Sequence, residues 1–314
     1  MKALWIIPLL SAALWGLEPV RKIPLLGSAI DTALKGEILI TGGDAGAIER
    51  FRLGEAKPFE QIVLPPVESL FGPHPPKIYS VDQSGAGALL WIAESKAGEG
   101  RSLSFKAPNQ APQTWIAPSE NRLLRKARFL PGGGVFAAEV GGVVALLDAS
   151  GRTVYRKTVM GSSFSDFALS QKGDLAAIAG ESGEVLIFDL QRGETLRRLS
   201  GGNKDNIYRI DWKSGRVITA GQDRIAAVYD DKSGGYDRFE TPFLISAAAL
   251  SPSAARVAYV QDESGAIAVA ERAGGRVLAT LRGHYALVGH ILFVDENRLI
   301  TGGDDNFLLE WRIP

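Results

Sequence analysis

The chain repeats itself about every 41 residues. A turn rich in Gly, Asp and Ser recurs along it, and its seven occurrences are centred on Gly46, Gly87, Gly142, Gly183, Arg224, Gly265 and Asn306. Five of the six intervals equal 41 residues, and the interval between Gly87 and Gly142 is 14 residues longer. A period of this length is typical of propeller-type repeats, in which one structural unit uses about 40–45 residues.

Each unit contains four short strand-forming segments. In the unit around Gly183, these segments are residues 167–169, 175–179, 185–190 and 195–199, and short polar or Gly-containing turns separate them. Short aliphatic and β-branched runs joined by such turns predict antiparallel hairpins. The sequence therefore predicts an all-β fold, a seven-bladed β-propeller with four antiparallel strands in each blade.

The seventh unit ends one strand early. Trp311 and Ile313 fall in its third strand, and the sequence stops at Pro314. Residues 19–25 form an additional predicted strand ahead of the first unit. We expect this strand to complete the last blade and to close the ring, because closure leaves only short, protected strand edges.

The N-terminus has the pattern of a secretory signal peptide. Lys2 supplies a positive charge, residues 3–15 are mostly apolar, and Gly16 follows. The apolar run is shorter than the roughly 20 residues of a membrane-spanning helix. We predict a signal peptide at residues 1–16, cleaved after Gly16 or alternatively after Ala13. An uncleaved anchor or a buried first strand is the other interpretation. Residues 17–314 then form one propeller domain, located in the periplasm without membrane insertion.

Charge and cysteine content narrow the function classes. Lys plus Arg and Asp plus Glu both number 35, so no overall field attracts the chain to nucleic acid. The absence of cysteine excludes disulfides, thiolate metal sites and a cysteine nucleophile. We expect a monomer that does not bind nucleic acid.

The last unit resembles a WD40 repeat. A Gly283-His284 pair precedes Trp311-Arg312 with the spacing of the Gly-His and Trp-Asp pairs of that family. The resemblance implies a structural hydrogen-bonded tetrad of His284, Thr301, Asp305 and Trp311, in which neutral His284 bridges Asp305 and Thr301. It also implies a propeller fold, and it gives no catalytic role to His284.

The other units depart from the motif. The position of Trp311 holds Phe51, Leu147, Phe188, Tyr229 and Ala270 in five of them, and Gly202 stands where the fifth unit would have its histidine. The repeated Ile-Thr-Gly-Gly-Asp phrase at residues 40–44 and 300–304, with the signal peptide, resembles the accessory propellers encoded beside periplasmic nitrate reductase in some epsilonproteobacteria. That resemblance implies a protein that supports the reductase system and whose partners are periplasmic redox-enzyme components.

Catalytic motifs are absent from the sequence. His74, His284 and His290 are the only histidines, no two of them have a metal-ligand spacing, and no Gly-x-Ser-x-Gly elbow occurs. We therefore predict a non-catalytic scaffold with no catalytic residue, cofactor or metal. The alternative is an enzyme or a small-ligand or cofactor-binding protein whose site lies at the central channel.

The irregular interval suggests a binding surface. We assign the 14 extra residues to segment 95–127, which contains Trp115 and the basic residues Arg122, Arg125 and Lys126. A second loop, residues 65–76, contains Phe71 and His74. Insertions in propellers map to loops on one face, and aromatic and arginine side chains commonly anchor partners. We expect these residues to form one protein-binding surface. The alternative is that Trp115 packs on a blade edge and that the basic cluster is simply solvated.

Overall fold

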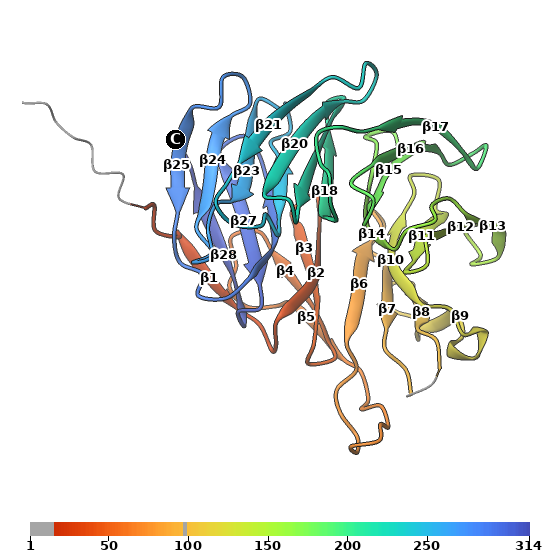
Figure 1. Ribbon diagram of the computed structural model, residues 1–314. Helices are drawn as coiled ribbons and strands as arrows, with labels where there is room; N and C mark the ends of the chain where they lie inside the picture. The colour runs from red at the N-terminus through yellow and green to blue at the C-terminus, as the bar shows by residue number, and fades with distance from the viewer. Residues whose placement is uncertain (1–15, 97–98) are drawn as a thin grey trace, which may run out of the picture.

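The computed structural model describes residues 16–96 and 99–314, so the predicted signal peptide lies almost entirely outside the described residues. These residues form seven four-stranded antiparallel sheets. The sheets are arranged as blades around a central axis (Figure 1). The predicted all-β, seven-bladed propeller is therefore confirmed. The only helix in the described residues is the short 3₁₀ segment η1 (Pro118–Glu120), and none there is long and apolar enough to cross a membrane.

In each blade the strands run from the channel outward in chain order. The first three blades contain β2 (Ala29–Lys35), β3 (Ile38–Gly43), β4 (Ala47–Arg52) and β5 (Glu60–Val63); β6 (Ile78–Gln83), β7 (Leu89–Ala93), β8 (Ser102–Lys106) and β9 (Gln113–Ile116); and β10 (Leu124–Phe129), β11 (Val135–Glu139), β12 (Val143–Leu147) and β13 (Thr153–Thr158).

The remaining four blades follow the same order except at ring closure. They contain β14 (Phe164–Leu169), β15 (Leu175–Gly180), β16 (Val185–Asp189) and β17 (Glu194–Leu199); β18 (Ile207–Lys213), β19 (Arg216–Gly221), β20 (Ile225–Asp230) and β21 (Tyr236–Glu240); β22 (Ala248–Leu250), β23 (Arg256–Val260), β24 (Ile267–Glu271) and β25 (Val277–Leu281); and β26 (Val288–Phe293), β27 (Arg298–Gly303), β28 (Phe307–Arg312) and β1 (Arg21–Pro24).

The propeller has two distinct faces. Because each blade is antiparallel, the start of its inner strand lies on the same face as its second turn and the end of its outer strand. We call this the junction face, since it carries the loops that join one blade to the next. These loops are residues 25–28, 64–77, 117–123, 159–163, 200–206, 241–247 and 282–287. The opposite face carries the first and third turns of each blade, and we call it the turn face.

The N-terminal strand closes the ring, as predicted. β1 pairs with β28 in antiparallel register from Arg21–Glu310 to Pro24–Phe307, and the Arg21 guanidinium lies 2.6 Å from the Glu310 carboxylate. The Ile23 side chain is only 2% exposed and packs in a core cluster between the last and first blades. The strand therefore contributes both backbone hydrogen bonds and apolar packing to closure.

We expect Ile23→Ala to destabilise the propeller by about 2–4 kcal/mol, because it removes a buried aliphatic side chain at the closure and leaves a cavity. Val20→Ala is the matched control, since Val20 is 57% exposed just before the same strand. Urea unfolding of the chain beginning at residue 17 measures both effects. Equal destabilisation by the two substitutions would show that β1 does not hold the ring closed.

The structure corrects the assignment of the irregular interval. Gly87 lies in the first turn of its blade, between β6 and β7, whereas the markers of the other blades lie in second turns. The second turn of that blade is instead residues 94–101. Segment 95–127 is therefore not an inserted loop, because it contains β8, β9, η1 and the start of β10. The longest blade-to-blade connection is loop 64–77, which was the second candidate.

Candidate functional site: the central channel and the junction face

The implied structural tetrad is present in the last blade. His284 Nδ1 lies 2.5 Å from Asp305 Oδ2, and His284 Nε2 lies 2.7 Å from Thr301 Oγ1. Trp311 Nε1 donates to the same Thr301 hydroxyl at 2.8 Å. Burial lowers the pKa of His284, which keeps the ring neutral. A neutral ring that donates to Asp305 and accepts from Thr301 satisfies every member, so these residues are structural.

The fifth blade contains a variant of the same network that the sequence comparison missed. Asn203, and not Gly202, occupies the position of the histidine. Its Nδ2 donates to Asp223 Oδ1 at 3.1 Å, and its Oδ1 accepts from the Thr219 hydroxyl at 2.5 Å. The loop before this blade, residues 200–206, is one residue longer than the loop 282–287 before the last blade. A fixed step of two periods therefore points to the residue just before Asn203.

Polar residues recur at one position of the inner strands. In six blades a β-bulge shifts the pairing of the inner strand near its start. The residues that follow these bulges are Asp31, Ser80, Lys126, Asp166, Arg209 and His290. All except Ser80 line the central cavity. The sequence does carry a signal for two of them, the phrase Asp-x-Ala-Leu at residues 31–34 and 166–169, but the predicted strand of the fourth unit began only at Phe167.

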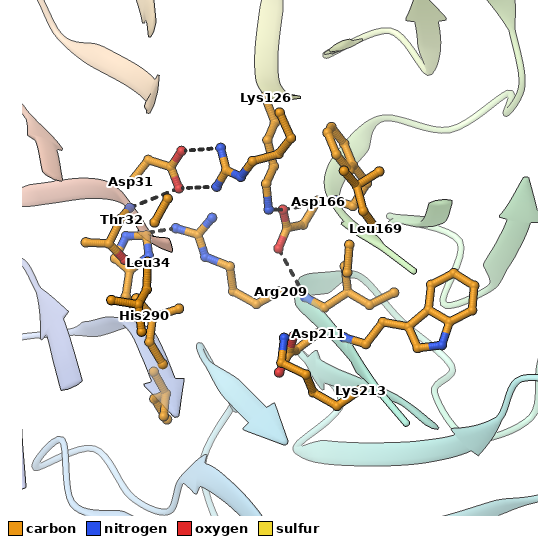
Figure 2. A pocket seen from close by; sticks show the side chains of 18 of the residues that line it. Asp31, Thr32, Leu34, Lys126, Asp166, Leu169, Arg209, Asp211, Lys213 and His290 are labelled. Atoms are coloured by element: carbon orange, nitrogen blue, oxygen red, sulfur yellow. Dashed lines mark hydrogen bonds and ion pairs between the residues drawn. The ribbon is translucent and has the colours of Figure 1, made fainter. Parts of the chain in front are cut away.

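Two ion pairs link blades across the channel. Arg128 makes a bidentate pair with Asp31, with both N–O distances 2.9 Å, and Lys126 Nζ lies 2.5 Å from Asp166 Oδ1 (Figure 2). Burial alone would raise the pKa of Asp31, but the Arg128 charge and hydrogen bonds outweigh it and hold that pKa well below its usual value. Burial lowers the pKa of Lys126, and the Asp166 charge only partly opposes this effect.

The same carboxylates also connect neighbouring inner strands. Asp31 accepts a hydrogen bond from the Val81 amide at 2.9 Å, and Asp166 accepts one from the Ile210 amide at 3.1 Å. Asp82 and Asp211 make the equivalent contacts, with the amides of Phe129 at 2.7 Å and Leu250 at 3.0 Å. An inner-strand aspartate therefore joins each of four blades to the next one.

Arg209 extends from β18 across the channel toward His290 (Figure 2). Its Nε donates to the Gly289 carbonyl at 2.9 Å, and its Nη2 reaches the Ile30 carbonyl at 3.4 Å. His290 Nε2 lies 2.8 Å from the same Ile30 carbonyl, which can only accept, so Nε2 carries the proton. Burial, with the adjacent Arg209 charge, lowers the pKa of His290 to about 3. The histidine is therefore neutral at physiological pH.

A cavity of about 550 Å³ fills the channel. At one end its lining consists of Asp31, Lys126, Asp166, Arg209 and His290, and at the other end it includes residues of first turns, namely Lys35, Gln171, Ser214 and Pro252. The cavity therefore opens on the turn face and ends at the ring of charged residues. Its volume lies within the roughly 300–1,000 Å³ of typical ligand pockets.

Loop 64–77 projects from the junction face between β5 and β6 (Figure 1). Backbone hydrogen bonds between Val67 and His74 close it as a narrow hairpin-like loop, and the Ser69 hydroxyl donates to the Gly72 carbonyl near its tip at 2.8 Å. Leu70, 93% exposed, and the fully exposed Phe71 form this tip. The loop thus presents two large apolar side chains to solvent.

The other predicted binding residues do not join Phe71 in one surface. Trp115 stacks on Phe105 with ring centroids 4.5 Å apart and packs on the edge of its blade, as the alternative interpretation held. Arg122 is buried against Glu139, with Nε 2.9 Å from the carboxylate, and Lys126 lies in the channel. These three residues are accounted for by packing and ion pairing within the propeller.

Arg125 and His74 remain near the junction face. His74 Nε2 lies 3.5 Å from Glu94 Oε2, which links loop 64–77 to the second turn of the next blade. Arg125 is at the start of β10, and its side chain has no ion pair or hydrogen bond to any described residue. Burial, with the nearby Arg209 charge, lowers the pKa of the Arg125 guanidinium. Arg125 is therefore a cation at the junction-face end of the channel without a protein partner.

Exposed large apolar side chains follow a clear distribution. One group lies in blade-joining loops of the junction face and comprises Leu26, Leu70, Phe71, Leu123, Tyr285 and Leu287. The other group lies on or immediately before outer strands and comprises Val20, Phe59, Val63, Val154, Leu196, Tyr236 and Val277. Phe59, next to a turn-face loop, has the Arg50 and Arg52 guanidiniums within 5.0 Å of its ring centroid. The junction face is thus the more apolar of the two faces.

A scan against protein-family models and a search of curated proteins match nothing in this chain. Within residues 16–96 and 99–314, no three His, Asp or Glu side chains are grouped so that they could hold a metal ion.

Proposed function

We propose that this protein is a non-catalytic propeller that binds a protein partner through its junction face. The observation that carries the proposal is the pair of exposed side chains, Leu70 and Phe71, at the tip of a projecting loop. Large apolar side chains displayed together on one face are typical of protein–protein contact sites. The exposed residues of four other junction-face positions, Leu26, Leu123, Tyr285 and Leu287, extend the same apolar character around the ring.

The charge at this face indicates the chemistry of the partner. Arg125 has no carboxylate partner within the described residues, and Arg209 lies close enough to repel it. An acidic side chain of a partner would relieve this repulsion. The partner surface therefore combines an apolar patch, which receives the loop tip, with a carboxylate that reaches the centre of the ring.

The location and the identity of the partner form the finer part of the proposal. The basic, apolar and small-residue order of residues 1–16 and the absence of cysteine support export to the periplasm. The resemblance to accessory propellers of periplasmic nitrate reductase supports a redox-enzyme component of that compartment as the partner. The protein then acts as a monomeric assembly or support factor, with no role in nitrate chemistry and none in nucleic-acid binding.

We expect the double substitution Leu70→Ser and Phe71→Ser to reduce partner capture by about tenfold or more, because the two side chains would anchor the interface. The matched control is Val154→Ser with Leu196→Ser, which changes two exposed apolar residues on outer strands. Capture from a periplasmic extract, quantified by mass spectrometry, measures the effect. Both variants should unfold at the temperature of the parent chain, since none of the four side chains is buried.

Two results would contradict this proposal. Undiminished capture by the loop variant would remove loop 64–77 from the interface. Equal loss in the outer-strand control would show that the partner contacts the blade edges instead.

A further inference from the structure

We propose that the central cavity binds a small organic anion with a short apolar body, with the acidic group against Lys126 and Arg209. The site is separate from the protein-binding surface, because the cavity opens on the turn face and the partner is proposed to contact the junction face. It assigns a ligand class to the channel that the sequence left as an alternative.

The depth of the cavity favours a ligand that enters by one end. The lining runs from first-turn residues such as Gln171 and Ser214 to the charged ring, where Arg209 crosses the axis. A ligand entering from the turn face therefore meets the ring last. The group of the ligand that recognises this blind end should be at its leading end.

Unused hydrogen-bonding capacity at the blind end consists mainly of donors. Lys126 uses one of its three N–H groups, on Asp166. Arg209 donates through Nε and Nη2, and its Nη1 has no hydrogen bond to a described residue. Both carboxylates are committed, because each oxygen of Asp31 and of Asp166 already accepts at least one hydrogen bond. Free donors and engaged acceptors favour a ligand that accepts, such as a carboxylate or phosphate group.

The charge of the ring points the same way. Three cations, Lys126, Arg128 and Arg209, face two anions, Asp31 and Asp166, which leaves one positive charge in excess. His290 is neutral and adds nothing to this sum. Asp82 also lines the cavity, and burial raises its pKa, so the structure disfavours a further negative charge there. A positive charge in a partly enclosed, low-dielectric site attracts an anion strongly and repels an ammonium group.

The walls favour an apolar body behind the acidic group. Between the ring and the opening, the half-buried side chains of Leu34, Leu169 and Leu292 line the cavity. Nearer the opening, Lys213 pairs with Asp211 at 3.0 Å, and Lys35 adds a positive charge. An aliphatic or aromatic acid therefore matches the sequence of environments along the cavity better than a fully polar metabolite does.

The test is calorimetric titration of the chain beginning at residue 17 with hexanoate, hexylammonium, benzoate and inorganic phosphate. We expect hexanoate and benzoate to bind and hexylammonium not to bind, because only the acids match the donors of the ring. Binding of phosphate as tight as that of the acids would assign the site to the anionic group alone. No binding of either acid or of phosphate at millimolar concentration, or equal binding of hexanoate and hexylammonium, would overturn the proposal.

Arg209→Gln should weaken hexanoate binding by about tenfold or more, since it removes a charged donor from the acidic group. Arg209→Lys keeps the charge and should recover a large part of that loss, which separates charge from a structural effect. Lys172→Gln is the matched control, because Lys172 is an exposed cation on a turn-face loop outside the lining. Thermal unfolding shows whether each variant is folded.

The loop variant Leu70→Ser with Phe71→Ser distinguishes this site from the partner surface. It should bind hexanoate with the affinity of the parent chain even where it no longer captures the partner. Loss of hexanoate binding in this variant, or unchanged hexanoate binding in folded Arg209→Gln, would show that the acid does not bind at the ring.

Discussion

Replacing Arg128 with methionine should lower the free energy of unfolding by about 3–5 kcal/mol, because the substitution leaves Asp31 buried without its counter-ion. The Arg128 guanidinium reaches both oxygens of Asp31 at 2.9 Å. It also donates to the Ser80 hydroxyl and to the Val81 carbonyl, so one side chain ties three inner strands together. Urea unfolding followed by tryptophan fluorescence measures the loss.

The second-site variant Asp31→Asn separates the charge from the packing. In the double variant Asp31→Asn, Arg128→Met the amide is neutral and can still accept the hydrogen bond from the Val81 amide. We expect the double variant to be more stable than Arg128→Met alone, since the unpaired charge is the main cost in the single variant. A double variant whose loss equals the sum of the two single losses would mean that the pair contributes no coupling.

The repeat predicts the architecture because a propeller blade is a local unit. Its four strands and three turns are consecutive, so hydrophobic runs and turn residues record them directly in the chain. The same local record could not place Gly87. Gly87 has a positive φ of 85°, and a turn of Ser and Gly residues serves equally well between the first and second strands as between the second and third. The turn type alone does not give the position within a blade.

The channel could not be predicted in the same way, because its contacts are not local. Asp31 and Arg128 are 97 positions apart, and only the curvature of the ring brings their blades together. Arg209 reaches the Ile30 carbonyl across a separation of 179 positions. A basic cluster at residues 122–128 was visible in the sequence, but alternation along β10 and the β-bulge after Leu124 direct its members to different places. Arg122 is buried, Arg125 is unpaired near the junction face and Lys126 enters the channel.

Acidification should destabilise the propeller from about pH 6.5 downward, and His290 should account for much of the loss. Its folded-state pKa of about 3 lies below the value of about 6.5 for an unfolded chain. Between these values the unfolded state binds a proton that the folded state does not, so the free energy of unfolding falls as pH falls. The slope approaches about 1.4 kcal/mol per pH unit, which gives roughly 2 kcal/mol between pH 7 and pH 5. Carboxylates with lowered pKa values, such as Asp31, act only below about pH 4.

His290→Gln should remove this part of the pH dependence. The glutamine amide can still donate to the Ile30 carbonyl, but it does not titrate. Urea unfolding of the parent chain and of His290→Gln at pH 7, 6 and 5 gives the comparison, and the difference between them should narrow by roughly 2 kcal/mol from pH 7 to pH 5. The buried His284 has a lowered pKa and remains in both chains, so a residual slope of the same sign is expected in the variant. Parallel pH profiles for the two chains would mean that His290 accepts a proton in the folded state. In that case the ring would carry a further positive charge in acid, next to Arg209.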